Sequence, residues 1–175
     1  MLITVSGSAG TGKSTLAKTL AEELALKYVC AGEIIREMAA EKKMDVIQFG
    51  EYLKSHPELD KEVDERIVAA GQSGDAVLEG RLVAWMMNQN KIPAYKILLK
   101  ASPEVAAMRI VGREGGELKL EMQKALAREA TNWKRYAELY GISTEDEAWY
   151  DLIVDTDEMR IPEVFAFVLK RVEKG

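Results

Sequence analysis

The chain has 175 residues, of which 47% are hydrophobic and 30% are charged, so it is long enough and apolar enough for one globular domain with a full core. Its single cysteine excludes an internal disulfide and a cysteine-based zinc site. The net charge of −5 argues against a broad nucleic-acid-binding surface, and no apolar run approaches membrane-spanning length. Because MLITVS leads directly into a glycine-rich loop, we expect no signal peptide and a cytoplasmic monomer without nucleic-acid or membrane partners.

The first expected element is a buried strand at residues 2–6, LITVS, followed at once by GSAGTGKST at residues 7–15. This stretch satisfies G-x-x-x-x-G-K-[ST], the pattern of a loop whose backbone N–H groups surround nucleotide phosphates. A helical pattern follows, and its N-terminus would add partial positive charge beneath an anion. Strand, loop and helix occur in the required order, which predicts a nucleotide-binding phosphate loop.

Two side chains of the phosphate loop carry specific chemistry. Lys13 can reach the β and γ phosphates, which makes it a candidate catalytic residue, and the hydroxyl of Ser14 can bind Mg²⁺. The residues predicted to bind the nucleotide are Gly7, Ser8, Ala9, Gly10, Thr11, Gly12, Lys13, Ser14 and Thr15.

Four more short apolar stretches are expected to be strands, at residues 27–31, 75–79, 95–100 and 151–156. Each is rich in Val, Ile or Leu, as strands buried on both faces usually are. Helical patterns fill the gaps between them. This alternation predicts an α/β fold in a single domain over residues 1–175, with a parallel five-stranded sheet and helices on both faces. Ligands should then gather at the carboxyl ends of the strands.

The segment 32–74 is longer than a crossover helix requires and is predicted to be an acceptor-binding insertion of several amphipathic helices. Asp45 is expected to cap one helix and Pro57 to begin another. Arg36 follows the second strand closely and should lie near the ligand cleft. The alternative for Arg36 is a solvated helix charge, the usual position of an arginine.

The third strand ends in Glu79, Gly80 and Arg81. An acidic residue at such a strand end assists Mg²⁺ in other phosphate-loop enzymes, so Glu79 is a candidate metal ligand together with Ser14. Arg81 would extend over the same cleft. A structural ion pair between Glu79 and Arg81 is the alternative.

The segment 113–149 is the second long gap and is predicted to be a lid with the helices that follow it. Gly115 and Gly116 interrupt the helical pattern and could act as a hinge. A mobile arm with several guanidinium groups could close over a transferring phosphoryl group and exclude water. An ordinary charged helix is the alternative for each arginine taken singly. The arginines in or near this segment are Arg109, Arg113, Arg128 and Arg135.

Other phosphate-loop classes fit less well. A GTPase needs N-K-x-D, whereas the nearest stretch, NKIP at residues 90–93, has proline in place of the aspartate. The H-R-D loop of a protein kinase is absent from the sequence. A motor ATPase would be longer. A small-molecule kinase remains.

A series of motifs resembles the archaeal-type cytidylate kinases over nearly the whole chain. In order, these are GSAGTGKST, AGEIIREMA, LDKEVDER, VLEGRLVAW, LKASPEV, RIVGREG, REATNWKRYAELYGI and YDLIVDT. The resemblance implies transfer of the γ-phosphoryl group of ATP to CMP or dCMP with Mg²⁺, giving ADP and CDP or dCDP. It implies that Arg36 and Arg81 bind the acceptor phosphate. It also implies phosphate contacts from the lid side by Arg109, Arg113, Arg128 and Arg135, of which we take the last three as catalytic and Arg109 as substrate-binding.

Cytosine recognition is less well defined by the sequence. Asp60, Asp64 and Arg66 could read the edge of the base from the acceptor insertion, and we take Asp64 as substrate-binding; a solvated charge is the alternative for each. Two other functions remain open. One is a kinase of another small acceptor, such as AMP, shikimate or dephospho-coenzyme A, and the other is an ATP-binding factor that assembles RNA or protein complexes.

Overall fold

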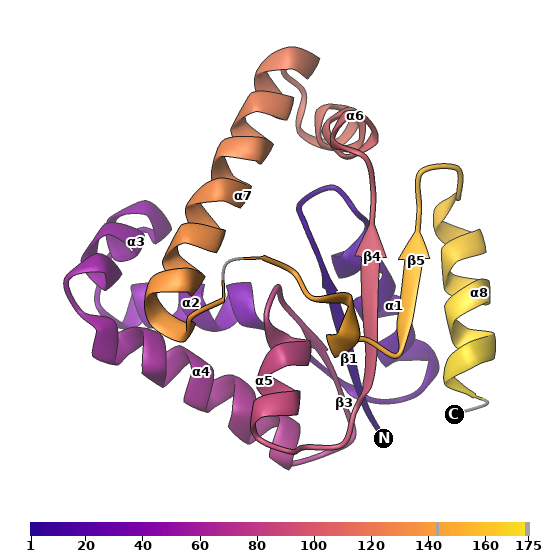
Figure 1. The fold of residues 1–175 in the computed structure, drawn as a ribbon, viewed down its shortest axis with the longest axis horizontal. Coiled ribbons are helices and arrows are strands. Elements are labelled where there is room, and N and C mark those ends of the chain that lie inside the picture. The colour runs from indigo at the N-terminus through magenta and orange to yellow at the C-terminus, as the bar shows by residue number, and fades with distance from the viewer. Residues whose placement is uncertain (143, 174–175) are drawn as a thin grey trace.

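Five parallel strands form the centre of the computed structural model, which describes residues 1–142 and 144–173 (Figure 1). The strands are β1 (Leu2–Gly7), β2 (Lys27–Cys30), β3 (Ala76–Glu79), β4 (Tyr95–Lys100) and β5 (Leu152–Asp155). Their order in the sheet is β2-β3-β1-β4-β5. The predicted fold class and all five predicted strands are confirmed. Because β1 lies between β3 and β4, the loop that follows it is at the middle of the carboxyl edge.

Helices cover both faces of the sheet, as expected for strands that are apolar on both sides. Ile3 and Val5 of β1 face one core with α1 (Lys13–Glu23) and α8 (Ile161–Val172). Leu2 points into the other core, which includes residues of α2 (Ala31–Glu41), α3 (Val46–Lys54), α4 (Pro57–Gln72) and α5 (Val83–Gln89). The period-two alternation along β1 therefore divides the core between the two helical layers.

The predicted acceptor insertion contains most of α2 and all of α3 and α4. Asp45 caps α3 as expected, because its carboxylate accepts a hydrogen bond of 2.8 Å from the backbone N–H of Gln48. The side-chain oxygen of Gln48 in turn accepts a hydrogen bond of 3.1 Å from the Asp45 backbone N–H. Helix α4 begins at Pro57, as predicted.

The predicted lid region contains the end of α6 (Pro103–Glu114) and all of α7 (Leu118–Tyr140). Gly115 and Gly116, with φ of +78° and +105°, lie between them, so the predicted break in the helical pattern is confirmed. Helix α7 runs from α6 toward α2 and α4, across the carboxyl edge of the sheet (Figure 1). A 3-10 turn, η1 (Glu147–Trp149), precedes β5.

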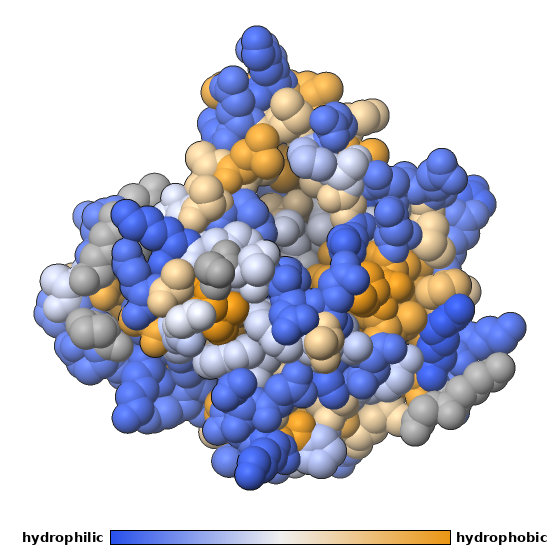
Figure 2. Space-filling view, viewed as in Figure 1, coloured by the Kyte–Doolittle hydropathy of each residue, from blue (hydrophilic) through white to orange (hydrophobic). Residues whose placement is uncertain are grey.

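The visible surface is mainly hydrophilic, with hydrophobic residues in separate small groups (Figure 2). No helix within residues 1–142 and 144–173 is long and apolar enough to cross a membrane.

Candidate functional site

The phosphate loop is held so tightly that two of its glycines have no room for a side chain. A Cβ on Gly7 would lie 2.6 Å from the carbonyl oxygen of Leu99 in β4. A Cβ on Gly10, where φ is +82°, would lie 2.5 Å from the carbonyl oxygen of Ala106 in α6. The loop is thus packed against β4 and α6, and α1 begins immediately after it at Lys13. This places the N-terminus of α1 directly under the loop.

Lys13 folds back over the phosphate loop. Its ammonium group donates a hydrogen bond of 3.2 Å to the carbonyl oxygen of Ser8. Burial lowers the pKa of Lys13 below its ordinary value, and the nearby Glu79 carboxylate acts in the opposite direction. A partly desolvated ammonium at this place is well suited to a polyanion.

Glu79 lies beside Ser14, as the metal prediction requires. The Ser14 hydroxyl donates a hydrogen bond of 2.7 Å to the Glu79 carboxylate, and Tyr28 in β2 donates to its other oxygen. A hydroxyl and one carboxylate are oxygen ligands that Mg²⁺ accepts when phosphates and waters complete its shell, so these residues fit the ion. The described residues contain no group of three or more His, Cys, Asp or Glu side chains that could hold a metal by itself.

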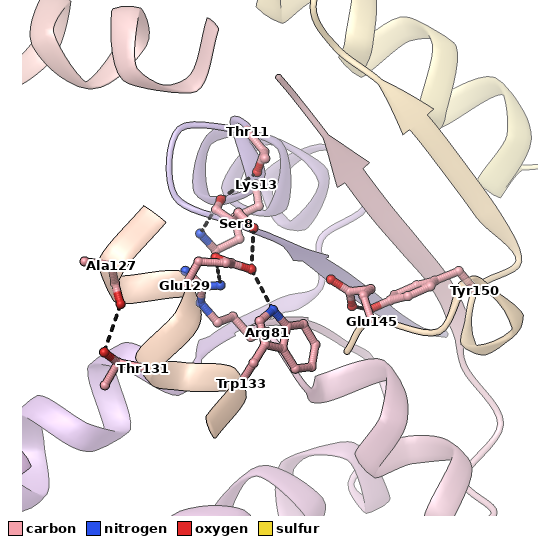
Figure 3. A network of polar contacts seen from close by, with 10 residues as sticks. All are labelled: Ser8, Thr11, Lys13, Arg81, Ala127, Glu129, Thr131, Trp133, Glu145 and Tyr150. Carbon is pink, nitrogen blue, oxygen red and sulfur yellow. Dashed lines mark hydrogen bonds and ion pairs between the residues drawn. The ribbon is translucent and has the colours of Figure 1, made fainter. Parts of the chain in front are cut away.

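Arg81 pairs with a residue that the sequence did not single out. The suggested ion pair between Glu79 and Arg81 is wrong; Arg81 instead forms an ion pair with Glu129 of α7 (Figure 3). Glu129 also accepts hydrogen bonds of 3.0 Å from the Ser8 hydroxyl and 3.0 Å from the indole N–H of Trp133. One carboxylate therefore joins the phosphate loop, the end of β3 and α7.

The environment of Glu129 favours its charged form. Burial by itself would raise the pKa of this carboxyl, but the hydrogen bond and charge of Arg81 outweigh burial, with smaller contributions from Ser8 and Trp133. The pKa of Glu129 therefore lies below its ordinary value. Glu129 is an anion at neutral pH, within a site that also contains Lys13 and Arg81.

A second group of polar side chains lies between α4 and α7. Asp60, whose side chain is only 7% exposed, forms an ion pair with Arg135. Tyr140 donates a hydrogen bond of 2.5 Å to Asp64. Burial raises the pKa of Asp64, and the hydrogen bond from Tyr140 offsets this only in part. These four side chains and Arg81 line a cleft of about 80 Å³ whose other walls are mainly apolar.

Arg109 lies outside the cleft between α4 and α7. Its guanidinium donates a hydrogen bond of 2.8 Å to the Thr156 hydroxyl and one of 3.4 Å to the carbonyl oxygen of Gly10. It therefore joins α6 to the phosphate loop and to the end of β5, and it does not line the cleft between α4 and α7. Its predicted phosphate contact is replaced here by backbone and hydroxyl partners.

The remaining predicted arginines lie at the surface and outside the Glu129 cluster. Arg36 is 3.8 Å from Glu33 on the same helix, with its side chain 56% exposed. Arg113 pairs with its neighbour Glu114. Arg128 is exposed on α7. Adjacent helical residues point about 100° apart, so the rotation of α7 that turns Glu129 inward leaves Arg128 facing solvent.

Known proteins are similar to this chain in sequence. A family model described as an AAA domain matches residues 6–130. The cytidylate kinase of Methanocaldococcus jannaschii is 44% identical over 174 residues, which cover 99% of this chain and 98% of that protein. The cytidylate kinase of Pyrococcus horikoshii is 43% identical, over 99% of this chain and 88% of that protein.

Solved structures agree in fold at lower identity. A shikimate kinase from Bacteroides thetaiotaomicron is 17% identical and superposes with a TM-score of 0.61 over 99% of this chain and 96% of that one. This likeness shows the fold alone, whereas the two cytidylate kinases are more than 40% identical over 99% of this chain. With its complete phosphate loop and these relatives, the chain belongs to the cytidylate kinase family of phosphate-loop proteins.

Proposed function

We propose that this protein transfers the γ-phosphoryl group of ATP to CMP or dCMP, giving ADP and CDP or dCDP. The observation that carries this proposal is the position of Arg81, which lines the acceptor cleft and is also joined through Glu129 to Ser8 of the phosphate loop. Donor and acceptor phosphates bound on its two sides would meet beside Lys13. The cytidylate kinases among its relatives support the choice of acceptor.

On the donor side, the backbone N–H groups of the phosphate loop and the Lys13 ammonium bind the β and γ phosphates. Ser14 and Glu79 would hold Mg²⁺, which, when bound, neutralises charge on the phosphate oxygens. Tyr28 orients the Glu79 carboxylate by donating to the oxygen that does not face Ser14. Arg109 supports the loop from α6 through Gly10.

On the acceptor side, Arg81 binds the nucleotide phosphate and holds it in line with the γ phosphorus, because a guanidinium fork matches two phosphate oxygens. The insertion 32–74 forms the acceptor site, and 113–149 forms the lid that closes over it. Arg36, Arg113 and Arg128 reach the phosphates only after closure. No general base is needed, since positioning and charge stabilisation dominate phosphoryl transfer.

The polar groups of the cleft match the edge of cytosine. Its exocyclic amino group donates hydrogen bonds, which the Asp64 carboxylate can accept, whereas its O2 and N3 accept hydrogen bonds. Arg135 was predicted to contact phosphate from the lid side, but it lines this cleft instead and can donate to these atoms. Uracil presents an oxygen in place of the amino group, and this would face a carboxylate unfavourably. Asp60 holds Arg135 in place through their ion pair.

An acceptor panel tests the proposal. Purified protein with ATP and Mg²⁺ is given CMP, dCMP, UMP, AMP, GMP or shikimate, and ADP release is measured. We expect CMP and dCMP to be phosphorylated at least about tenfold faster than the others, since one well-placed polar group discriminates by that much or more. Preferential turnover of AMP or shikimate would assign a different acceptor. Slow ATP hydrolysis that no acceptor stimulates would favour an assembly factor.

A further inference from the structure

Glu129 presents a carboxylate to groups that are suited to bind phosphate. Its side chain extends from α7 to the Ser8 hydroxyl and the Arg81 guanidinium (Figure 3). These two partners donate to its two different oxygens. A carboxylate and a phosphate both offer paired anionic oxygens to a guanidinium fork, so they compete for the same donors.

The two positive charges of the site are matched by two negative charges only when Glu129 is in the site. Lys13 and Arg81 are its cations, Glu79 and Glu129 its anions, and the charges of all three others act on the pKa of Lys13. The phosphates of two nucleotides would add several negative charges to this cluster. Glu129 would then face like charge in a partly desolvated site, which is unfavourable. It must therefore leave Arg81 when the acceptor phosphate binds.

The lid helix is built so that it can move. Helix α7, all of whose residues are described, has no side chain that is fully buried. It is joined to α6 through Gly115 and Gly116, whose positive φ angles are freely accessible to glycine. Trp133, one helical turn beyond Glu129, donates to the same carboxylate and moves with it. Since α7 is docked only by partly buried groups, among them Trp133, Tyr136 and Tyr140, the loss of one polar contact should lower its local stability.

We propose that Glu129 is an internal mimic of the acceptor phosphate, which holds α7 against the phosphate loop and Arg81 in the ligand-free protein. This inference rests on the proposed function. The acceptor phosphate replaces the carboxylate on Arg81, and its binding thereby releases α7 from its ligand-free position. The acceptor can bind only molecules in which the pair between Arg81 and Glu129 is open. Its apparent affinity is therefore the intrinsic affinity multiplied by the fraction of open molecules.

The decisive variant is Glu129→Gln, which keeps the size of the side chain and its acceptor oxygen but removes its charge. Glu138→Gln is the matched control, because Glu138 is an exposed residue of the same helix. Calorimetric titration with CMP measures affinity, and amide hydrogen exchange on the ligand-free protein measures the docking of α7.

We expect Glu129→Gln to lower the dissociation constant for CMP about tenfold, as when nine molecules in ten are latched, and to speed exchange of α7 amides. Glu138→Gln should change neither the affinity for CMP nor the exchange of α7.

Two results would overturn the proposal. Weaker CMP binding in Glu129→Gln would show that Glu129 positions Arg81 for the acceptor. Unchanged affinity together with unchanged exchange would show that Glu129 does not hold α7 in place. If wild-type protein does not bind CMP, the proposed function fails, while the exchange comparison still tests the latch. If Glu129→Gln does not fold, Glu129→Asp, which withdraws the charge by one methylene, should shift both measurements in the same direction.

Discussion

Asp64 is a partly buried carboxyl whose ionisation is unfavourable in the folded state. Its pKa is raised by burial, so the folded state favours its protonated form. This contribution to stability is complete below the ordinary pKa of about 3.9 and is lost as pH rises through the higher folded value. Asp64 therefore lowers the stability of the fold when it is ionised.

Replacement of Asp64 by Asn should separate its proposed role in binding from its effect on stability. An amide can donate to the O4 oxygen of uracil, so we expect kcat/KM for CMP to fall by roughly 10- to 100-fold while the preference for CMP over UMP weakens. The melting temperature at pH 7 should stay equal or rise. The stability advantage of Asp64→Asn over wild type should shrink as the pH falls, because protonation of Asp64 in the folded state removes the cost of its buried charge.

Steady-state kinetics with CMP and UMP, together with melting curves at several pH values, check this prediction. Glu65→Gln is the control, because Glu65 is the exposed neighbour of Asp64 on α4 and undergoes the same change of charge. An unchanged ratio of CMP to UMP turnover in Asp64→Asn would remove Asp64 from the base site.

At the scale of elements, the position of the phosphate loop is fixed by β4 and α6, which pack against it. Gly10 lies against the backbone of Ala106, which no side-chain rotation can move away. Gly10→Ala would therefore displace the loop as a whole and strain a residue at φ of +82°. We expect kcat/KM for ATP to fall on the order of a hundredfold, the usual effect of displacing catalytic groups by about 1 Å.

Gly50→Ala in α3 is the matched control. A Cβ there would meet no heavy atom within 4 Å, and alanine is the better helix former. This variant should keep its activity and gain about 0.5–1 kcal/mol of stability. Kinetics with ATP and thermal melting of both variants test the pair of expectations. Wild-type activity in Gly10→Ala would mean that the loop adapts by a route other than displacement.

At the scale of the whole molecule, the central strands carry the stability on which the site depends. Ile97 is fully buried in β4, which lies between β1 and β5. Ile97→Ala would leave a cavity and should cost about 2–5 kcal/mol. The melting temperature should fall by roughly 4–20 °C, since 1 kcal/mol is worth about 2–4 °C in a domain of this size.

Activity should separate from stability in this variant. Well below its melting temperature, Ile97→Ala should keep a near-normal KM for both nucleotides, because its side chain lies in the core and not in the site. Met108→Ala, at a side chain that is 59% exposed, should leave the melting temperature almost unchanged. A large rise in KM without a fall in melting temperature would contradict this separation.

Local sequence patterns were enough to predict the main elements of the fold. The strands, the phosphate loop between β1 and α1, the cap at Asp45 and the break at Gly115 are all features of residues close together in the chain. Apolar runs, glycines and capping side chains act over a few residues, so their effect is readable without the fold. The proximity of Ser14 and Glu79 was also predictable, because adjacent parallel strands bring their carboxyl ends to one edge.

The partners within the site were decided only by the tertiary structure. Arg81 meets Glu129 across 48 residues, and Tyr28 meets Glu79 across 51. The rotation of α7 about its axis, set by its contacts with α4 and α6, decides that Glu129 faces the phosphate loop while Arg128 faces solvent. The sequence of an amphipathic helix does not show which of its charged residues faces inward and which faces solvent. Only the docking of α7 distinguishes them, because pairing energy depends on distance and burial rather than on residue type.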